Sequence, residues 1–317
     1  MNKLAETLAV FVSPINKLMD LLSRAFGYVW EPHKVKKMAE AEAYRIREIS
    51  QAISENRDLP IEYSKDGFSI KISETKDLTG RALCRFVKQE TQREYNLETI
   101  ADEAYDILKE ATSDTNENVS DDWIAKFISY AQDVSDEDMK KIWARILAGE
   151  VKKPGSFSFR TLSILRNLSK EEAQIFGKCC SLMVDYAITR NSDLLEAFGI
   201  SYDDILKMDD CGLINSDGMI TGKVELTLEG DNIFCSKNYV LRCKSGKSNE
   251  LILDEFPFTA SGRELYTITG QSLNDEFLLF LAKDIREKNH NIFVSLHKII
   301  SKKDDDIEYD DHNLLDD

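Results

Sequence analysis

The sequence predicts a mainly α-helical protein with a central helical bundle and a smaller α+β part towards the C-terminus. Apolar residues recur at three- and four-residue steps through much of the first 190 residues, which is the spacing of amphipathic helices. Serines followed by acidic first turns repeat through the middle of the chain and are typical of helix starts. After Asn191, short β-rich runs separated by glycine indicate strands.

Residues 1–54 are expected to form N-terminal amphipathic helices. From Pro14 to Trp30 the apolar residues lie at helical spacing, Pro32 interrupts the pattern, and good helix formers resume after it. Residues 55–79 differ, because an Asp66–Gly67 turn separates two short runs with some alternation. This segment is therefore predicted to be a hairpin or an ordered loop.

Residues 80–190 are predicted to form the central helical bundle. A long helix is expected from about Arg81 to about Ala111, and the polar segment TSDTNENVSDD at 112–122 follows as a linker. The hydroxyls of four serines can accept a hydrogen bond from an amide of the next helix's first turn. These serines are Ser120, Ser135, Ser169 and Ser201.

The segment LAGEVKKPGSFSFRT at 147–161 predicts a corner between two helices. Gly149 stands where a helix C-cap is expected, and Pro154–Gly155 prevents the helix from continuing. A functional interpretation would use Glu150 and Arg160 as an exposed charged pair at this corner. Turn and cap chemistry explains almost every residue of the segment, so the structural interpretation is preferred.

Residues 191–303 are expected to form an α+β domain that ends in a helix. Asn274 is the predicted cap of that helix, which is expected to cover NDEFLLFLAKDIREKNHNIFVSLHKII. The order helix, turn, strand is typical of a winged-helix module and also of other small α+β domains. Residues 304–317 are expected to be a disordered acidic tail, since residues 301–317 hold two Lys/Arg against eight Asp/Glu.

Composition excludes several classes of protein. The net charge of −16 makes the molecule as a whole repel nucleic acids and anionic membranes. The six cysteines contain no CxxC pair, so we expect free thiols in a reducing cytoplasm. The early apolar segment Leu8–Trp30 is interrupted by polar residues, and no cleavage site follows it, which predicts neither a membrane span nor a secretory signal.

Motifs for cofactors, metals and nucleophiles are missing from the sequence. The segment KSGKS at 244–248 ends like a phosphate loop but has Leu241 where the first glycine is required. His290 and His297, seven residues apart on the expected final helix, have no carboxylate or thiol between them on that face. We therefore expect no cofactor, no metal site and no catalytic residues.

The stretch from 121 to 176 holds a distinctive set of residues: Trp123, Phe127, Trp143, ILAGE at 146–150, PGSFS at 154–158, RTL at 160–162, and LS at 168–169 before Glu172 and Ala173. Through these residues the stretch resembles a bacterial family catalogued as domain of unknown function 2806. The resemblance extends more loosely to EAEA at 40–43 and FTASGREL at 258–265. A more distant similarity in layout to alpha-type abortive-infection proteins implies a place in bacterial antiphage defence. The resemblance supplies no catalytic residues.

The N-terminal amphipathic helix is the candidate contact surface. Its apolar face and the basic cluster behind it comprise Leu18, Leu22, Phe26, Trp30, Lys34, Lys36 and Lys37. An apolar face followed by lysines can dock on a membrane surface, here the inner face of the membrane. The same face can instead be buried against the long helix or against a second subunit, which is the preferred interpretation.

These observations predict a cytoplasmic, non-enzymatic interaction or regulatory protein that works through helical surfaces and self-association, as a component of antiphage defence. One alternative is an interfacial membrane-binding effector that uses residues 13–37. A second is a winged-helix-like nucleic-acid binder. The basic clusters available to it are small: Arg160, Arg166 and Lys170, and then Lys237, Arg242, Lys244 and Lys247.

Overall fold

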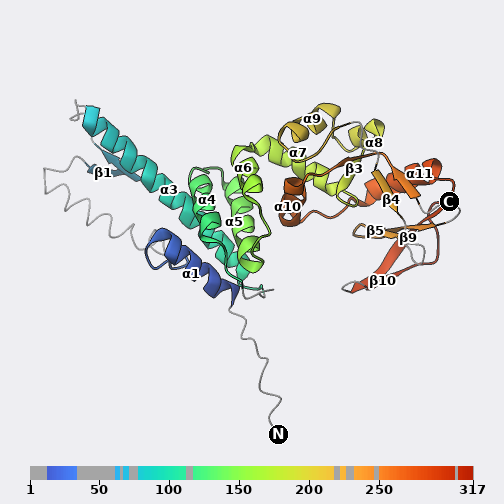
Figure 1. Ribbon diagram of the computed structural model, residues 1–317, viewed down its shortest axis with the longest axis horizontal. Coiled ribbons are helices and arrows are strands. Elements are labelled where there is room, and N and C mark those ends of the chain that lie inside the picture. Colours follow the sequence, from blue (N-terminus) through green and yellow to red (C-terminus); the bar gives the residue numbers. More distant parts are fainter. Residues whose placement is uncertain are drawn as a thin grey trace, which may run out of the picture. The chain divides into compact units, whose positions relative to one another are not determined.

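The computed structural model describes residues 13–33, 61–64, 67–70, 78–111, 117–217, 222–225, 232–245, 250–303 and 306–316. The chain divides into two compact units, residues 1–162 and 163–317. The first unit is mainly helical and the second mixes helices with strands (Figure 1). The division falls inside the span 80–190 that was expected to form one bundle, so the helices of that span belong to both units.

Among its described residues, the first unit contains four helices and a hairpin. Its elements are α1 (Pro14–Phe26), β1 (Ile61–Ser64), β2 (Gly67–Ile70), α3 (Leu78–Leu108), α4 (Asp121–Ala131) and α5 (Glu137–Lys152), and α6 (Phe159–Asn167) begins at its end. The antiparallel strands β1 and β2 flank the predicted turn, with Ile61 paired to Ile70. Helix α3 packs against α5, and α1 packs against α3, α4 and α5.

Aromatic side chains form the centre of the first unit. Trp123 and Phe127 of α4 stack with ring centroids 5.2 Å apart, and Phe127 meets Trp143 of α5 edge-on at 5.3 Å. All three are buried, and the indole nitrogen of Trp123 donates to the carbonyl of Phe157 at 2.7 Å. Buried residues of α5 recur at helical spacing from Met139 onwards, so one face of this helix is buried.

The second unit contains five helices beyond α6 among the described residues. They are α7 (Lys170–Ser181), α8 (Ser192–Ala197), α9 (Tyr202–Asp210), α10 (Ala260–Thr269) and α11 (Asp275–Lys288). Capping boxes at Ser169 and Ser201 start α7 and α9, and Asn274 caps α11 by accepting from the amide of Phe277. These three caps confirm the sequence prediction. Two other predicted serine caps are wrong: α5 is capped by Asp136 instead of Ser135, and the side chain of Ser120 makes no capping hydrogen bond at the start of α4.

The strands of the second unit form three antiparallel groups among the described residues. They are β3 (Ala187–Thr189), β4 (Gly222–Glu225), β5 (Asn232–Cys235), β6 (Tyr239–Ser245), β7 (Glu250–Leu253), β8 (Glu255–Pro257), β9 (Ile292–Lys303) and β10 (Asp306–Tyr309). The four-stranded sheet has the order β10-β9-β6-β5, while β3 pairs with β8 and β4 with β7. Helix α11 packs against β6 and β9.

The predicted final helix is too long. Helix α11 ends at Lys288, and the residues from Ile292 onwards form strand β9. The reason is the change of period: Phe293 is 70% exposed, whereas Ile292 and Val294 on either side of it are buried, which is the alternation of a strand covered on one face. His290 therefore lies between a helix and a strand, and it does not share a helical face with His297.

The acidic C-terminal segment is ordered from Asp306 to Asp316, contrary to the expected tail. Strand β10 pairs with β9, and the side chain of Asn313 accepts from the amide of Leu296 at 3.0 Å. The ring of Tyr309 lies beside His297, with centroids 5.2 Å apart. This segment is ordered because a few apolar and amide side chains, such as Tyr309 and Asn313, lie between its acidic residues and contact β9. A count of charges does not reveal these side chains.

Candidate functional site

The predicted contact face of α1 lies in the interior of the first unit. Leu18, Leu22 and Trp30 are at most 1% exposed, and Phe26 is half-buried. Helices α3, α4 and α5 cover this face, because burying it removes the large apolar area that an isolated amphipathic helix would leave in water. These residues are therefore internal packing residues and do not form an exposed partner or membrane contact. The lysines 34, 36 and 37 of the prediction lie outside the described residues.

The segment after α1 is tied to α3 by hydrogen bonds. The indole of Trp30 donates to Glu98 Oε2 at 2.8 Å, and the hydroxyl of Tyr28 lies 2.6 Å from both Glu94 Oε1 and Glu98 Oε1. Partial burial, and then the two carboxylates, raise the pKa of Tyr28 well above its usual value. These hydrogen bonds fix the position of residues 28–30 on α3, in addition to the apolar packing of α1.

His33 completes this attachment. Its backbone amide donates to Asp102 Oδ1 at 2.5 Å, and its Nε2 lies 3.0 Å from Asp106 Oδ1, which also accepts from Lys109. Partial burial by itself would raise the pKa of Asp106, but the hydrogen bonds from Lys109 and His33 outweigh it and the pKa is lowered. Sequence reasoning missed these contacts because each joins residues about 70 positions apart.

The corner at 147–161 is a structural turn, and its predicted charged pair is wrong. Glu150 is 2% exposed, and its carboxylate accepts from the amides of Gly155 at 2.7 Å and Phe157 at 3.0 Å. Arg160 is exposed, so the two side chains do not form an exposed pair. Gly149 is not a cap either: α5 continues to Lys152, and the missing side chain admits the ring of Phe157.

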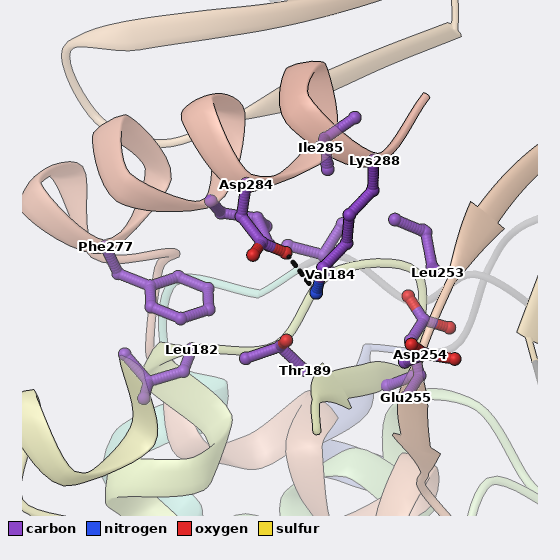
Figure 2. A pocket seen from close by; sticks show the side chains of 12 residues that line it. Leu182, Val184, Thr189, Leu253, Asp254, Glu255, Phe277, Asp284, Ile285 and Lys288 are labelled. Atoms are coloured by element: carbon purple, nitrogen blue, oxygen red, sulfur yellow. Dashed lines mark ion pairs between the residues drawn. The ribbon is translucent and has the colours of Figure 1, made fainter. Parts of the chain in front are cut away.

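The second unit has a small pocket between α11, β3 and β8 (Figure 2). Apolar residues form much of its wall, including Phe277 and Val184, and Thr189 contributes a hydroxyl. Asp284 accepts from Lys288 Nζ at 2.9 Å and from the amide of Asn191 at 3.0 Å. The pocket's volume of about 20 Å³ is room for roughly one water molecule.

Glu255 gives this pocket a pH-dependent stability. Burial, helped by the charge of Asp185, raises the pKa of Glu255 to about 7. The folded-state pKa of Glu255 lies above its unfolded-state pKa. The contribution of Glu255 to the stability of the fold is therefore fully present below pH 4.5 and is lost as the pH rises through 7.

We expect Glu255→Gln to stabilise the second unit by about 1 kcal/mol at pH 8, and not at pH 4. Urea unfolding at the two pH values, with the exposed Glu287→Gln as control, checks this; equal gains at both would contradict it.

The second unit also has the element order that the winged-helix interpretation requires. Helix α7 is followed by β3, α8 and α9, and the chain returns through an Ile214–Phe258 bridge beside β8. Helix α9, however, reads YDDILKMDD, with four aspartates and one lysine. A surface of this charge repels phosphates, so the nucleic-acid interpretation gains no support from it. Arg242 of the predicted basic cluster lies over the ring of Tyr309, 5.0 Å from its centroid.

No metal centre is found in the described part of the chain, where no group of three or more His, Cys, Asp or Glu side chains is placed to hold an ion. Among the described helices, none combines the length and the apolar character needed to cross a bilayer. A separate candidate is a surface on α3.

Helix α3 exposes several large apolar side chains. Of the fifteen large apolar side chains exposed among the described residues, five lie on this helix: Leu78, Phe86, Val87, Tyr95 and Ile107. Its second half is anchored, since Ile100, Ala104 and Leu108 are at most 1% exposed. Phe86 lies on the same side of the helix as Ile100, Ala104 and Leu108, three to four turns before Ile100, but it is 61% exposed. We call this series of residues the α3 stripe. Figure 1 shows the first turns of α3 extending past α4 and α5.

Comparison with known proteins agrees with the sequence resemblance. Residues 80–198 and 189–282 match the model of a protein family described as protein of unknown function (DUF2806). No curated protein and no solved structure matches the chain. The matched residues include most of α3, the corner and much of the second unit, and they make up more than half of the chain. The chain therefore belongs to the DUF2806 family of proteins of unknown function.

Proposed function

We propose that this protein is a non-enzymatic interaction or regulatory protein that contacts other protein chains through the exposed first half of α3. The observation that carries the proposal is the exposure of Phe86 on the stripe that is buried further along the same helix. An apolar stripe that continues beyond its own core is typical of a surface that packs against another chain.

The test is photo-crosslinking in the cells that make the protein. We expect p-benzoylphenylalanine in place of Phe86 to give covalent adducts of higher mass on irradiation, because a partner seated on the first half of α3 lies within reach of this side chain. The matched control is the same replacement at Phe280, which is 49% exposed on α11. Adducts are detected by immunoblotting and identified by mass spectrometry.

Two results would count against the proposal. An absence of adducts from position 86 at normal expression would remove the surface, and equal adducts from positions 86 and 280 would show unspecific capture. Recovery of a defined protein from position 86 alone supports it. A small molecule or nucleic acid in place of a protein adduct would also contradict it.

A place in bacterial antiphage defence, in the cytoplasm, belongs to the same proposal. It is supported by the layout similarity to alpha-type abortive-infection proteins. Challenge of cells with and without the gene by a phage panel tests it, and unchanged plating would count against it. The membrane-binding alternative is not favoured, because Leu18, Leu22 and Trp30 are buried.

A further inference from the structure

One face of α3 carries charges that change sign along its length. Residues at three- and four-residue steps share a helical face. On this face lie Arg81, Arg85, Lys88, Gln92, Tyr95, Thr99, Glu103 and Asp106. All are exposed apart from Thr99, which is half-buried. The face is therefore basic in its first half, neutral in the middle and acidic in its second half; we call it the charge-reversing face.

A face of this kind is complementary to itself when reversed. If a second α3 lies antiparallel, with the midpoint of the contact between Gln92 and Tyr95, Arg85 stands beside Glu103. Arg81 then stands opposite Asp106, a carboxylate that His33 and Lys109 of its own chain already contact. A two-fold axis repeats the Arg85–Glu103 pair, giving two new oppositely charged pairs across one contact. The side chain of Tyr95, which is 48% exposed, lies close to the axis and supplies apolar area at its centre. A parallel arrangement would instead set like charges side by side.

Other occupants fit this face less well. A uniformly acidic ligand such as a nucleic acid would be attracted by Arg81 and Arg85 but repelled by Glu103 and Asp106. A uniformly basic segment meets the opposite mismatch. A partner with the reversed charge order matches throughout, and a second copy of this chain supplies it.

We propose that two copies of the protein associate through the charge-reversing face of α3, antiparallel, with Arg85 of each copy paired to Glu103 of the other. This goes beyond the proposed interaction function, because Phe86 does not lie at the three- and four-residue steps of this face and is therefore on another side of α3. Exposed ion pairs are individually weak, so the dissociation constant is expected in the range of about 10–100 µM at low salt. Screening by added salt weakens the contact.

The experiment is sedimentation equilibrium of the full 36.2 kDa chain at low and high salt. Loading concentrations of about 5 to 200 µM cover the expected dissociation constant. Arg85→Glu places two carboxylates together and is expected to weaken the dimer at least about tenfold. Glu103→Arg, which sets Arg85 against another arginine, should do the same. An equimolar mixture of the two variants, or both changes in one chain, restores opposite charges at each pair and should restore association.

Arg160→Glu is the matched control, since it makes the same charge change at an exposed position on α6 and should leave association unchanged. Circular dichroism confirms that the variants are folded, as expected for changes at exposed helix positions. A chain that stays monomeric at the highest concentration, a dimer insensitive to both substitutions, or a failure of the combined variants to associate would each overturn the antiparallel pairing.

The two proposals fail differently. A monomeric chain whose position 86 captures another protein in cells keeps the interaction function and removes self-pairing. No capture from position 86 removes the interaction surface, even where purified chains associate. Capture of a defined protein from position 86 together with charge-dependent association supports both.

Discussion

Replacing Gly262 with alanine will destabilise the second unit by about 3 kcal/mol or more. Gly262 lies in the first turn of α10, and a methyl group there would overlap the backbone carbonyl of Leu213. That carbonyl cannot move freely, because it accepts from the amide of Thr259 at 3.0 Å. The Thr259 hydroxyl in turn donates to Gly212 at 2.7 Å and caps α10 by accepting from the amide of Gly262. The substitution therefore forces either the helix or the turn after α9 out of place.

Thiol accessibility during urea unfolding measures this effect. Apart from Cys84, the cysteines of the chain lie in the second unit, so a Cys84→Ser background reports on that unit alone. Cys179 and Cys180 are fully buried, and burial raises the pKa of Cys179 to about 12, so these thiols react only after unfolding. Gly177→Ala is the control: its added methyl meets open space in α7 and should stabilise by about 0.5–1 kcal/mol. Equal midpoints for the two variants would contradict the prediction.

Replacing Glu150 with alanine will destabilise the first unit by about 3 kcal/mol. The carboxylate is the acceptor for the amides of Gly155 and Phe157 in a corner that is closed from water. Its removal leaves the buried Phe157 amide without this acceptor and releases the loop that brings the Phe157 carbonyl to Trp123. Alanine is a good helix former, so the loss is not one of helix propensity.

Tryptophan fluorescence isolates this change, since Trp30, Trp123 and Trp143 all lie in the first unit. A loss of about 3 kcal/mol should lower the urea midpoint by roughly 1–3 M, given typical denaturant slopes for small domains. Glu110→Ala, at an exposed position just after α3, is the control and should shift the midpoint little. An unchanged midpoint for Glu150→Ala would show that Glu150 has no structural role. A change in thiol exposure without a change in fluorescence would place the effect in the second unit and would also contradict the prediction.

Sequence reasoning predicted the local parts of this structure well. The capping boxes at Ser169 and Ser201 and the cap at Asn274 involve residues three positions apart, so their energetics lie within a single helical turn. The hairpin between β1 and β2 and the extent of α3 follow from equally local patterns. Each of these signals is visible in a short window of sequence.

Candidate sites were predicted poorly, for a consistent reason. The α1 face looked available for a partner because its cover, α3, lies far along the chain. Glu150 looked exposed because charged residues usually are, and only the fold of the loop shows that two amides need its carboxylate. The charge-reversing face of α3 was present in the sequence as an i, i+3, i+4 series, but its exposure became clear only when the helix was seen to extend beyond its packed half.

The sequence by itself determined the starts of α7, α9 and α11, the mainly α then α+β character, and the family to which the chain belongs. Tertiary structure decided which amphipathic faces are covered, that residues 292–303 form a strand, and that the acidic C-terminal segment pairs with it. The physical reason is range: caps, turns and helical periodicity depend on neighbours within a few residues. Burial and strand pairing depend on surfaces supplied from distant parts of the chain, and no short window of residues encodes them.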